Sequence, residues 1–474
     1  MDQVQEQLLQ RISAVENQLK QALFAAGTEA PDLKLEDMMK SYSVPGLSIA
    51  VIDQGKIDWA KGYGQRTLEG RDLVTPATLF QVASISKPIT AFGVLRLVDR
   101  GLISLDEPVN SVLKTWKIPE NNFTLKTPIT LRHLLTHSSG ANVSGFPGYK
   151  FNEPLPTTIQ ILKGQKPANT EGLRICSTPG AEHSYSGAGF IVIQLLLEEL
   201  SGLSFSEYMR TQVLEPLGMS ESYFSQPLSA GLQVDVASGH TAKEAMVPGR
   251  WHTYPELAAA GLWSTPSDLC RFSLGLQNAA NGVPGALLSV ATARSMLTPG
   301  VEDWGLGIGL GGSLEGGDGF FSHGGGNEGY ICMLFGFMTQ GRGAAITTNA
   351  DTGNEIVMEI LRAISSVYGW SILAPRPVEL AACPPETLAD YCGTYQSIDD
   401  PDMMLKIDMK ATKLIMRSRH TKGAVLEARS HTEFVCLDNG AQVSFAAATD
   451  GSSQLTLWGQ EYRKESKLCD EITG

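Results

Sequence analysis

The sequence predicts an α+β domain, an antiparallel sheet flanked by helices, followed by a small antiparallel β-barrel. Apolar runs at 47–52 and 56–62 flank a Gly-containing turn, which predicts a β-hairpin, and strand-like runs return within 330–349. A stiff Ala-Pro-Arg-Pro stretch at 374–377 is typical of a domain boundary. After it, short alternating runs recur at regular spacing between 404 and 458, the pattern of a small barrel.

Helical patterns fill most of the remaining sequence. Apolar residues between 88 and 105 predict a largely buried helix that ends near Gly101, and residues 355–368 predict another. The segment 130–272 alternates helical patterns with Pro and Gly, which indicates a helical subdomain inserted between sheet segments.

A chain of 474 residues is longer than one hydrophobic core usually supports. We therefore expect an N-terminal amphipathic helix within 1–30, a catalytic domain at 31–373 and the barrel at 374–474. Apolar residues of the first helix fall at a and d spacing, which fits either a dimer contact or, as we favour, packing on its own domain. These residues are Leu8, Ile12, Val15, Leu19, Ala22 and Ala26.

Composition and charge exclude several classes of partner. A formal net charge of -13, with Lys and Arg scattered along the chain, offers no basic face for nucleic acid and disfavours anionic membrane surfaces. The N-terminus lacks a basic and then apolar leader, and no window approaches a membrane span. The seven cysteines include no CxxC pair. We expect a cytoplasmic protein with reduced thiols, a small-molecule or short-peptide substrate, and either a monomer or a homodimer.

Two Ser-x-x-Lys motifs are candidates for a nucleophile and its base. At this spacing the lysine amine can reach the serine hydroxyl on one helix face, and the helix N-terminus favours the developing alkoxide. Ser84 and Lys87 follow an extended apolar segment and open the long buried helix, which would hold them rigidly. Ser111 and Lys114 lie in a short stretch ended by Pro119. The context therefore favours Ser84.

A lysine that accepts the serine proton needs a second group to share or remove its own. Tyr185 follows the turn at Pro179-Gly180, just ahead of a buried helix, and is our candidate. A tyrosine in this position is more often a core residue, so only its combination with Ser84 and Lys87 supports the assignment.

The third candidate is the run from Ser322 to Gly326, which includes His323, Gly324 and Gly325, placed just before a strand. Consecutive glycines let a substrate approach the backbone and leave N–H groups free to bind an oxyanion. The alternative is a plain glycine-rich turn, which the run alone would favour.

Taken together and in order, these motifs resemble the serine β-lactamase and penicillin-binding-protein superfamily, especially its class C β-lactamase-like, D-aminopeptidase-like and esterase members. The C-terminal stretch that begins Tyr391-Cys-Gly393-Thr-Tyr395 resembles the lipocalin-like barrel of some members. The motifs are Ser84-Ile-Ser-Lys87, Thr130-Leu-Arg-His-Leu-Leu-Thr-His137-Ser-Ser-Gly140, Pro179-Gly180 leading to Tyr185-Ser186, Gly261-Leu-Trp-Ser-Thr265-Pro-Ser-Asp268, Trp304-Gly305-Leu-Gly307 and His323-Gly324-Gly325.

The resemblance implies a β-lactamase-like or transpeptidase-like fold and an acyl-enzyme route. Ser84 would attack, Lys87 and Tyr185 would relay protons, with either one as the base, and the backbone N–H groups of Ser84 and Gly326 would form the oxyanion hole. His323 would be catalytic. It replaces the lysine that opens the third motif in most β-lactamases.

Three glycines would contact the substrate: Gly187, Gly324 and Gly325. Gly187 stands where the Tyr-x-Asn motif has an asparagine that holds the substrate amide. Its presence, like that of His323, points away from β-lactams, although losing one polar contact costs only about 1–3 kcal/mol.

The leading hypothesis is a serine hydrolase that acts on an ester or a small peptide amide, including one with a D-residue. Alternatives are an acyltransferase or peptide-cyclising thioesterase with an amine or alcohol acceptor, and a sensor that is acylated without turnover. Two GxGxxG matches, at 307–312 and 324–329, lack the strand and helix of a dinucleotide site, so we expect no cofactor. His133 and His137 share a helix face without a carboxylate partner, and we interpret them as structural rather than as metal ligands.

Overall fold

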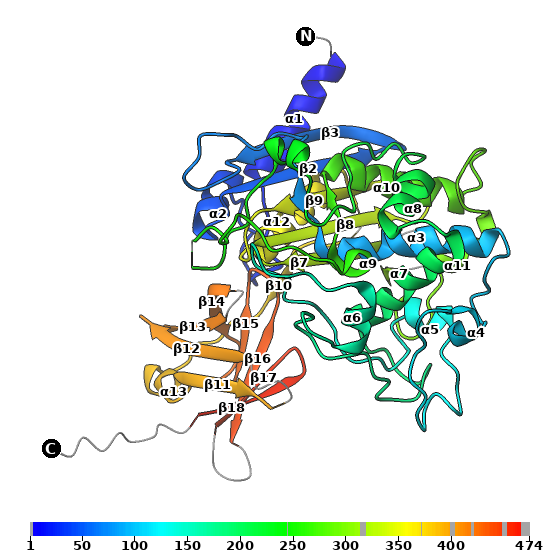
Figure 1. Cartoon of the computed structure of the whole chain (residues 1–474). Helices are drawn as coiled ribbons and strands as arrows, with labels where there is room; N and C mark the ends of the chain where they lie inside the picture. The colour runs from blue at the N-terminus through cyan, green and yellow to red at the C-terminus, as the bar shows by residue number, and fades with distance from the viewer. Residues whose placement is uncertain are drawn as a thin grey trace. The chain divides into compact units, whose positions relative to one another are not determined.

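The computed structural model describes residues 3–243, 245–312, 319–370, 372–398, 403–418, 421–447 and 453–465, and Figure 1 shows its elements. The chain forms two compact units. The central unit is Val44–Gly353, and the terminal unit combines Met1–Ser43 with Asn354–Gly474. The domain limits expected at 30/31 and 373/374 stay a prediction.

The central unit contains a six-stranded antiparallel sheet in the order β3-β2-β9-β8-β7-β6. The predicted hairpin is confirmed, with Gln54 and Gly55 in the left-handed region at its turn. The predicted later strands are confirmed as β8 and β9. The sheet strands are β2 (Gly46–Asp53), β3 (Lys56–Gly64), β6 (Gly309–Gly311), β7 (Phe320–Asn327), β8 (Tyr330–Phe337) and β9 (Gly343–Thr348).

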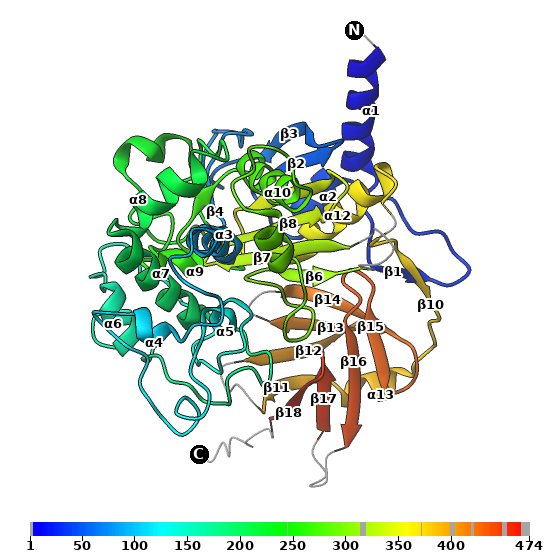
Figure 2. The ribbon, with the colours of Figure 1, turned by 90° about the vertical axis from the view of Figure 1, so that its right-hand side faces the viewer.

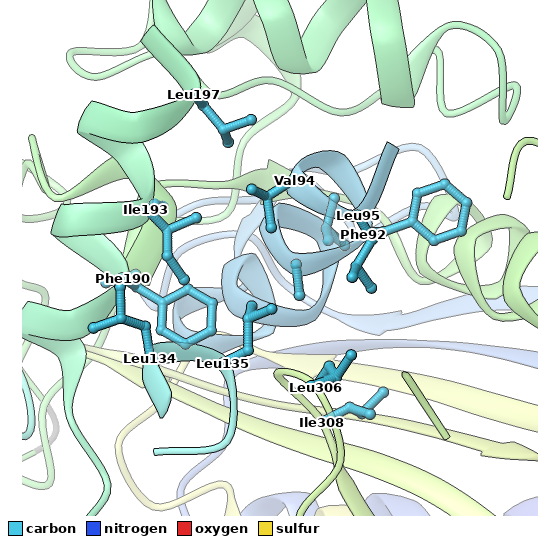
Figure 3. Packing of buried hydrophobic residues seen from close by; sticks show 14 of the residues in the cluster. Phe92, Val94, Leu95, Leu134, Leu135, Phe190, Ile193, Leu197, Leu306 and Ile308 are labelled. Carbon is cyan, nitrogen blue, oxygen red and sulfur yellow. The ribbon is translucent and has the colours of Figure 1, made fainter. Parts of the chain in front are cut away.

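Helix α3 (Ser86–Asp99) is the buried centre of this unit. Phe92 on α3 packs in one hydrophobic cluster with Leu135, Phe190 and Ile308, as Figure 3 shows at close range. The helix ends where the sequence predicted, because Gly101 takes a positive φ and its N–H donates to the Val98 carbonyl. Burial on all sides gives α3 a fixed position in the fold.

Short elements surround α3 and the sheet. The remaining helices of the central unit are α4 (Val109–Val112), α5 (Leu131–Leu135), α6 (Thr158–Lys163), α7 (Gly187–Ser201), α8 (Phe205–Met209) with a π-helical turn η2 (Arg210–Leu214), a 3₁₀ turn η3 (Ala230–Asp235), α9 (Leu257–Ala260), α10 (Pro266–Ala280) and α11 (Val290–Met296). Two short strands, β4 (Phe80–Gln81) and β5 (Trp263–Ser264), pair with each other. The helical segment predicted between residues 130 and 272 is therefore present, in short pieces.

The terminal unit begins with α1 (Gln3–Asn17), shorter than the a and d pattern predicted. The pattern fails after Asn17 because the backbone finds other partners. Leu19 pairs with Leu33, and β1 (Leu23–Ala25) pairs in parallel with β10 (Arg376–Val378). Two further helices of this unit, α2 (Leu35–Ser41) and α12 (Asn354–Val367), contact each other and α1.

An acidic cluster is buried in the terminal unit. Tyr42 donates a 2.8 Å hydrogen bond to Glu359 Oε1, and Glu359 is fully buried. Burial raises the pKa of Glu359 to about 8, and the hydrogen bond from Tyr42 opposes this rise. Asp438 accepts a hydrogen bond from Gln21, and Arg362 donates to the Asp438 carbonyl at 3.3 Å.

Eight antiparallel strands, β11 to β18, close into a barrel after the short helix α13 (Pro385–Asp390), as Figure 2 shows. The six runs predicted from alternation are confirmed as β12 to β17, while β11 and β18 were not predicted as strands. The barrel strands are β11 (Gly393–Ser397), β12 (Met404–Lys410), β13 (Lys413–Ser418), β14 (Thr421–Ala428), β15 (Glu433–Cys436), β16 (Gln442–Ala447), β17 (Ser453–Leu457) and β18 (Gln460–Lys464). Apolar side chains such as Tyr395, Leu414 and Leu455 fill its interior.

Within the described ranges, no single helix is both long and apolar enough to cross a membrane. In the same ranges, α7 and α8–η2 are long and apolar enough when taken together, but they are bent by 78° relative to each other. Cysteines 176, 270, 332, 383, 392 and 436 carry free thiols, and Cys469 lies outside the described residues.

Candidate active site

Ser84 lies in a tight 3₁₀ turn, η1 (Ala83–Ile85), that leads directly into α3. Ala83 has a φ of 49°, a left-handed conformation that is rare for a residue with a Cβ and is typical of strained functional turns. The turn is held by Ser86, whose hydroxyl donates to the Ala83 carbonyl at 2.6 Å and accepts from the Leu262 N–H at 3.1 Å. The Ser84 side chain is therefore presented from a backbone that is fixed on both sides.

Lys87 contacts the Ser84 hydroxyl directly. Its Nζ lies 2.9 Å from Ser84 Oγ and 2.9 Å from the Ala259 carbonyl oxygen of α9. The residue is only 2% exposed, so water does not compete effectively for the amine. The geometry predicted for the first Ser-x-x-Lys motif is thus present, with the lysine held between a carbonyl and the hydroxyl.

Tyr185 joins this pair just before α7. Its ring centroid lies 5.0 Å from Lys87 Nζ and 6.2 Å from the ring of His323. Trp304 contacts the tyrosine edge-on at 5.8 Å between ring centroids. The structure therefore brings Ser84, Lys87, Tyr185 and His323 into one place.

His323 lies inside strand β7. Its glycine-rich run precedes a strand as expected, namely β8, but the run itself is also a strand, not the plain turn given as the alternative. The run needs no side chains to pair, because residues 323–327 form a regular antiparallel ladder with β8. The His323 side chain is buried, and its Nδ1 lies 2.6 Å from the Gly324 carbonyl oxygen. Since a carbonyl only accepts, Nδ1 carries the proton and Nε2 presents a lone pair. Burial, reinforced by the nearby Lys87 ammonium, lowers the pKa of His323 to about 3.

The three glycines of β7 face different surroundings. A Cβ at Gly325 would lie 2.2 Å from the Val82 carbonyl oxygen, so this strand touches the backbone just before Ser84. A Cβ at Gly324 or Gly326 would meet nothing closer than 3.9 Å or 3.5 Å, respectively. Because β6 pairs only with residues 320–322, the later part of β7 keeps one edge toward the Ser84 turn. The oxyanion hole formed by the N–H groups of Ser84 and Gly326 stays a prediction. The edge of β7 that faces the Ser84 turn would allow it.

Gly187, the residue in place of an asparagine, packs against Phe146. A Cβ at Gly187 would lie 2.8 Å from Phe146 Cε2 and 3.1 Å from the Ser144 carbonyl oxygen. The aromatic ring therefore takes the space that a longer side chain would need. Gly187 thus supplies no amide, and the side chain beside it is apolar.

Sequence reasoning missed a buried amide network behind the site. Asn327 Nδ2 donates to Gln81 Oε1 at 2.8 Å and to the Ala260 carbonyl at 3.1 Å, and Gln81 Nε2 donates to the His252 carbonyl at 2.7 Å. These bonds join the end of β7 to β4 and α9 beside Ser84. The signal that the sequence offers is one amide residue in each of two segments: Gln81 in the apolar segment before Ser84, and Asn327 at the end of the glycine-rich run.

The second Ser-x-x-Lys motif forms no such site. Ser111 is exposed and donates to the Pro108 carbonyl at 2.6 Å, while Lys114 reaches the Glu199 carbonyl at 3.5 Å. The short helix α4 ends at Val112, so Ser111 and Lys114 do not share a helix face. Of the two motifs, the one that the sequence context favoured is the one in which the lysine contacts the serine hydroxyl.

The structure also bears on the other candidate motifs. The glycine patterns at 307–312 and 324–329 fall on strands β6 and β7, and neither opens a helix. Across the described part of the chain, no group of three or more His, Cys, Asp or Glu side chains could hold a metal ion. His133 closes the capping box of α5 with Thr130.

A strained serine turn, a buried lysine on its hydroxyl and a glycine edge beside it form the kind of arrangement that acyl-transferring serine enzymes use. The chain belongs to the beta-lactamase family, whose sequence model matches residues 32–368. Members of this family are serine hydrolases that act through acyl transfer. The closed eight-stranded barrel follows the matched region.

Two relatives by sequence are informative. Penicillin-binding protein 4* of Bacillus subtilis (strain 168) is 24% identical over 428 residues, which cover 85% of this chain and 90% of that protein. Protein flp of Staphylococcus aureus (strain COL) is 26% identical over 195 residues. That match spans 41% of this chain and only 38% of protein flp.

Solved structures share the fold. The octameric penicillin-binding protein homologue from Pyrococcus abyssi has a TM-score of 0.62 at 24% identity, over 91% of this chain and 99% of that one. SurE, solved with D-Leu, has a TM-score of 0.56 at 21% identity, over 91% of this chain and 97% of that one. At these identities the likeness extends to the fold alone.

Proposed function

We propose that this protein is a serine hydrolase in which Ser84 forms an acyl-enzyme with an ester or a small peptide amide. The observation that carries the proposal is the 2.9 Å contact between Lys87 Nζ and Ser84 Oγ in a buried, strained turn. In the proposed reaction Ser84 Oγ attacks the substrate carbonyl, and its proton passes to whichever of the two bases acts, a neutral Lys87 amine or a Tyr185 phenolate. The leaving group takes up a proton, and water then releases the acid.

The substrate class follows from two side chains of the site. His323 is neutral and offers a lone pair at Nε2, where a lysine would offer a cation for a substrate carboxylate. Phe146 offers an apolar face beside Gly187, where an asparagine would hold an amide. Both changes favour an uncharged ester or a small amide with an apolar group next to the reacting carbonyl.

The test of the nucleophile uses a fluorophosphonate probe and intact-mass analysis. We expect Ser84→Ala to lose the label completely, and the matched Ser111→Ala variant, changed in the other motif, to be labelled as the unchanged protein is. Label retained on Ser84→Ala would refute the proposal. Sustained turnover of p-nitrophenyl esters separates a hydrolase from a sensor, which would give a single burst equal to the enzyme concentration.

Substrate identity requires a screen of paired compounds. Leucine esters and amides in D and L forms belong in it, because the structurally similar SurE is described with D-Leu. Each compound is assayed with and without an added amine. A coupled product in place of the free acid would identify an acyltransferase instead of a hydrolase.

A further inference from the structure

His137 was interpreted from the sequence as a structural residue, and it ends α5 in the left-handed conformation that glycine usually takes at a helix C-terminus. It lies just after α5 (Leu131–Leu135), is 1% exposed, and has a φ of 52°. The left-handed region costs a non-glycine residue free energy, and such strain persists only where surrounding contacts fix it. The contacts around His137 must therefore offset the free-energy cost of its left-handed backbone.

Both hydrogen bonds that His137 accepts hold the residues next to Tyr185. The Ser184 N–H donates to the His137 carbonyl at 2.7 Å, and the Ser186 N–H donates to His137 Nδ1 at 3.1 Å. Ser186 in turn caps α7, because its hydroxyl accepts from the Gly189 N–H. The backbone on each side of Tyr185 is thus tied to one histidine.

The imidazole also contacts the tyrosine ring itself. The two ring centroids are 4.2 Å apart with an interplanar angle of 32°, and Trp304 packs edge-on against the imidazole at 5.2 Å. Since Nδ1 accepts a hydrogen bond, the neutral ring carries its proton on Nε2. Burial, reinforced by the Lys87 ammonium, holds the pKa of His137 well below its usual range. The ring therefore stays neutral beside the lysine.

We propose that His137 is a positioning residue that holds Tyr185 against Lys87 Nζ and so sets the geometry of proton transfer at Ser84. The inference rests on the proposed acyl-enzyme function, in which Tyr185 takes part. His137 does not touch the reacting atoms in this scheme. It acts through the tyrosine by means of two backbone hydrogen bonds and one ring contact.

Two substitutions at His137 separate its contributions. His137→Leu removes the acceptor and the aromatic ring, and we expect kcat for a p-nitrophenyl ester to fall about 100-fold, the effect of roughly 1 Å of misplacement. KM should change by less than about threefold, because ground-state binding is not altered. His137→Asn keeps a side-chain oxygen for the Ser186 N–H and tolerates the left-handed backbone. The kcat of His137→Asn should therefore be about tenfold higher than that of His137→Leu.

The decisive measurement is a double-mutant cycle with Tyr185→Phe, read as the rate at which a fluorophosphonate phosphonylates Ser84 with loss of fluoride. If His137 acts through Tyr185, His137→Leu should change this rate less than about twofold in the Tyr185→Phe background. An equal loss in both backgrounds, or an unchanged kcat in His137→Leu, would overturn the proposal. If His137→Leu does not fold, His137→Asn takes its place in the cycle and is judged by the same criterion.

Two controls separate this proposal from others. His133→Gln changes the histidine within α5 to a residue that can still close the capping box, and we expect kcat to stay unchanged. Thermal unfolding of every variant shows whether the fold is intact. Ser84→Ala tests the proposed function separately, because label on that variant would refute the nucleophile whatever the cycle shows.

Discussion

The close approach of β7 to the serine turn can be tested by one methyl group, in the variant Gly325→Ala. Its Cβ would lie 2.2 Å from the Val82 carbonyl oxygen, whereas real Cβ contacts essentially never fall below 3.0 Å. The strand and the turn must therefore separate by about 0.8 Å, counted from that limit. Both are backbone segments, so no flexible side chain can absorb the shift.

Two opposing effects set the size of the change. Replacing glycine by alanine reduces the entropy of the unfolded chain, which alone would stabilise the protein by about 0.4–1 kcal/mol. Overpacking a tight site typically costs about 1–3 kcal/mol. Overpacking wins, and we expect net destabilisation of about 1–2 kcal/mol. If the edge of β7 binds the oxyanion as predicted, moving it away from Ser84 should lower kcat/KM about 100-fold.

The assay combines p-nitrophenyl ester kinetics with urea unfolding. Gly324→Ala is the matched control for stability, since its Cβ would meet nothing closer than 3.9 Å on the same strand. Its free energy of unfolding should stay within about 0.5 kcal/mol of the original, or rise slightly. If Gly325→Ala keeps both its stability and its kcat/KM, β7 does not touch the serine turn as described, and the reasoning is refuted.

Three further predictions concern polarity and charge. The carboxyl group of Glu359 has a pKa of about 8 in the folded protein and of about 4.5 in the unfolded chain. The folded protein therefore binds the proton more tightly, and the free energy of unfolding should fall as the pH rises between these two values. Glu359→Gln should flatten this slope, at most about 1.4 kcal/mol per pH unit, in urea titrations from pH 5 to 8; an unchanged slope would contradict the assignment. Phe146 fills the space beside Gly187, so Gly187→Asn should lower the soluble yield and should not confer nitrocefin hydrolysis. Adding Phe146→Ala to this variant should restore the soluble yield. Nitrocefin turnover by the single variant would disprove this steric argument. His323 stays neutral above about pH 4, so the pH profile of kcat/KM from 5 to 8 should be the same shape in His323→Gln; loss of an inflection in that variant would show that His323 titrates.

Much of the architecture was predictable because the spacing of apolar residues along a short segment shows which of its faces is buried. The hairpin of β2 and β3 and the strands β12 to β17 follow directly from alternation and turn residues. The first helix was overextended, because its a and d pattern continues through Leu19 while the backbone there pairs with Leu33. A local pattern cannot report a partner that arrives later in the sequence.

The site was predictable where chemistry imposes spacing and hidden where contacts are long-range. Ser84 and Lys87 are three residues apart, so their contact follows from helix geometry. The bond between Asn327 and Gln81 joins residues 246 positions apart and leaves no local trace. The glycine-rich run was not recognised as a strand for a related reason. Glycine weakens a strand, and the backbone that approaches Gly325 closely, at Val82, is far away in the sequence.

The split of the terminal unit between the two ends of the chain has a consequence for biosynthesis. The central unit is one continuous segment, Val44–Gly353, and its contacts are complete before the barrel has been translated. In the terminal unit β1 must instead wait for β10, where Leu23 pairs with Arg376, and the barrel closes only when β18 joins β11. Because domains generally fold as units during synthesis, we expect the serine turn to form on the ribosome while the N-terminal segment is still unpaired. Nascent chains stalled after Gly353 should therefore already react with a fluorophosphonate.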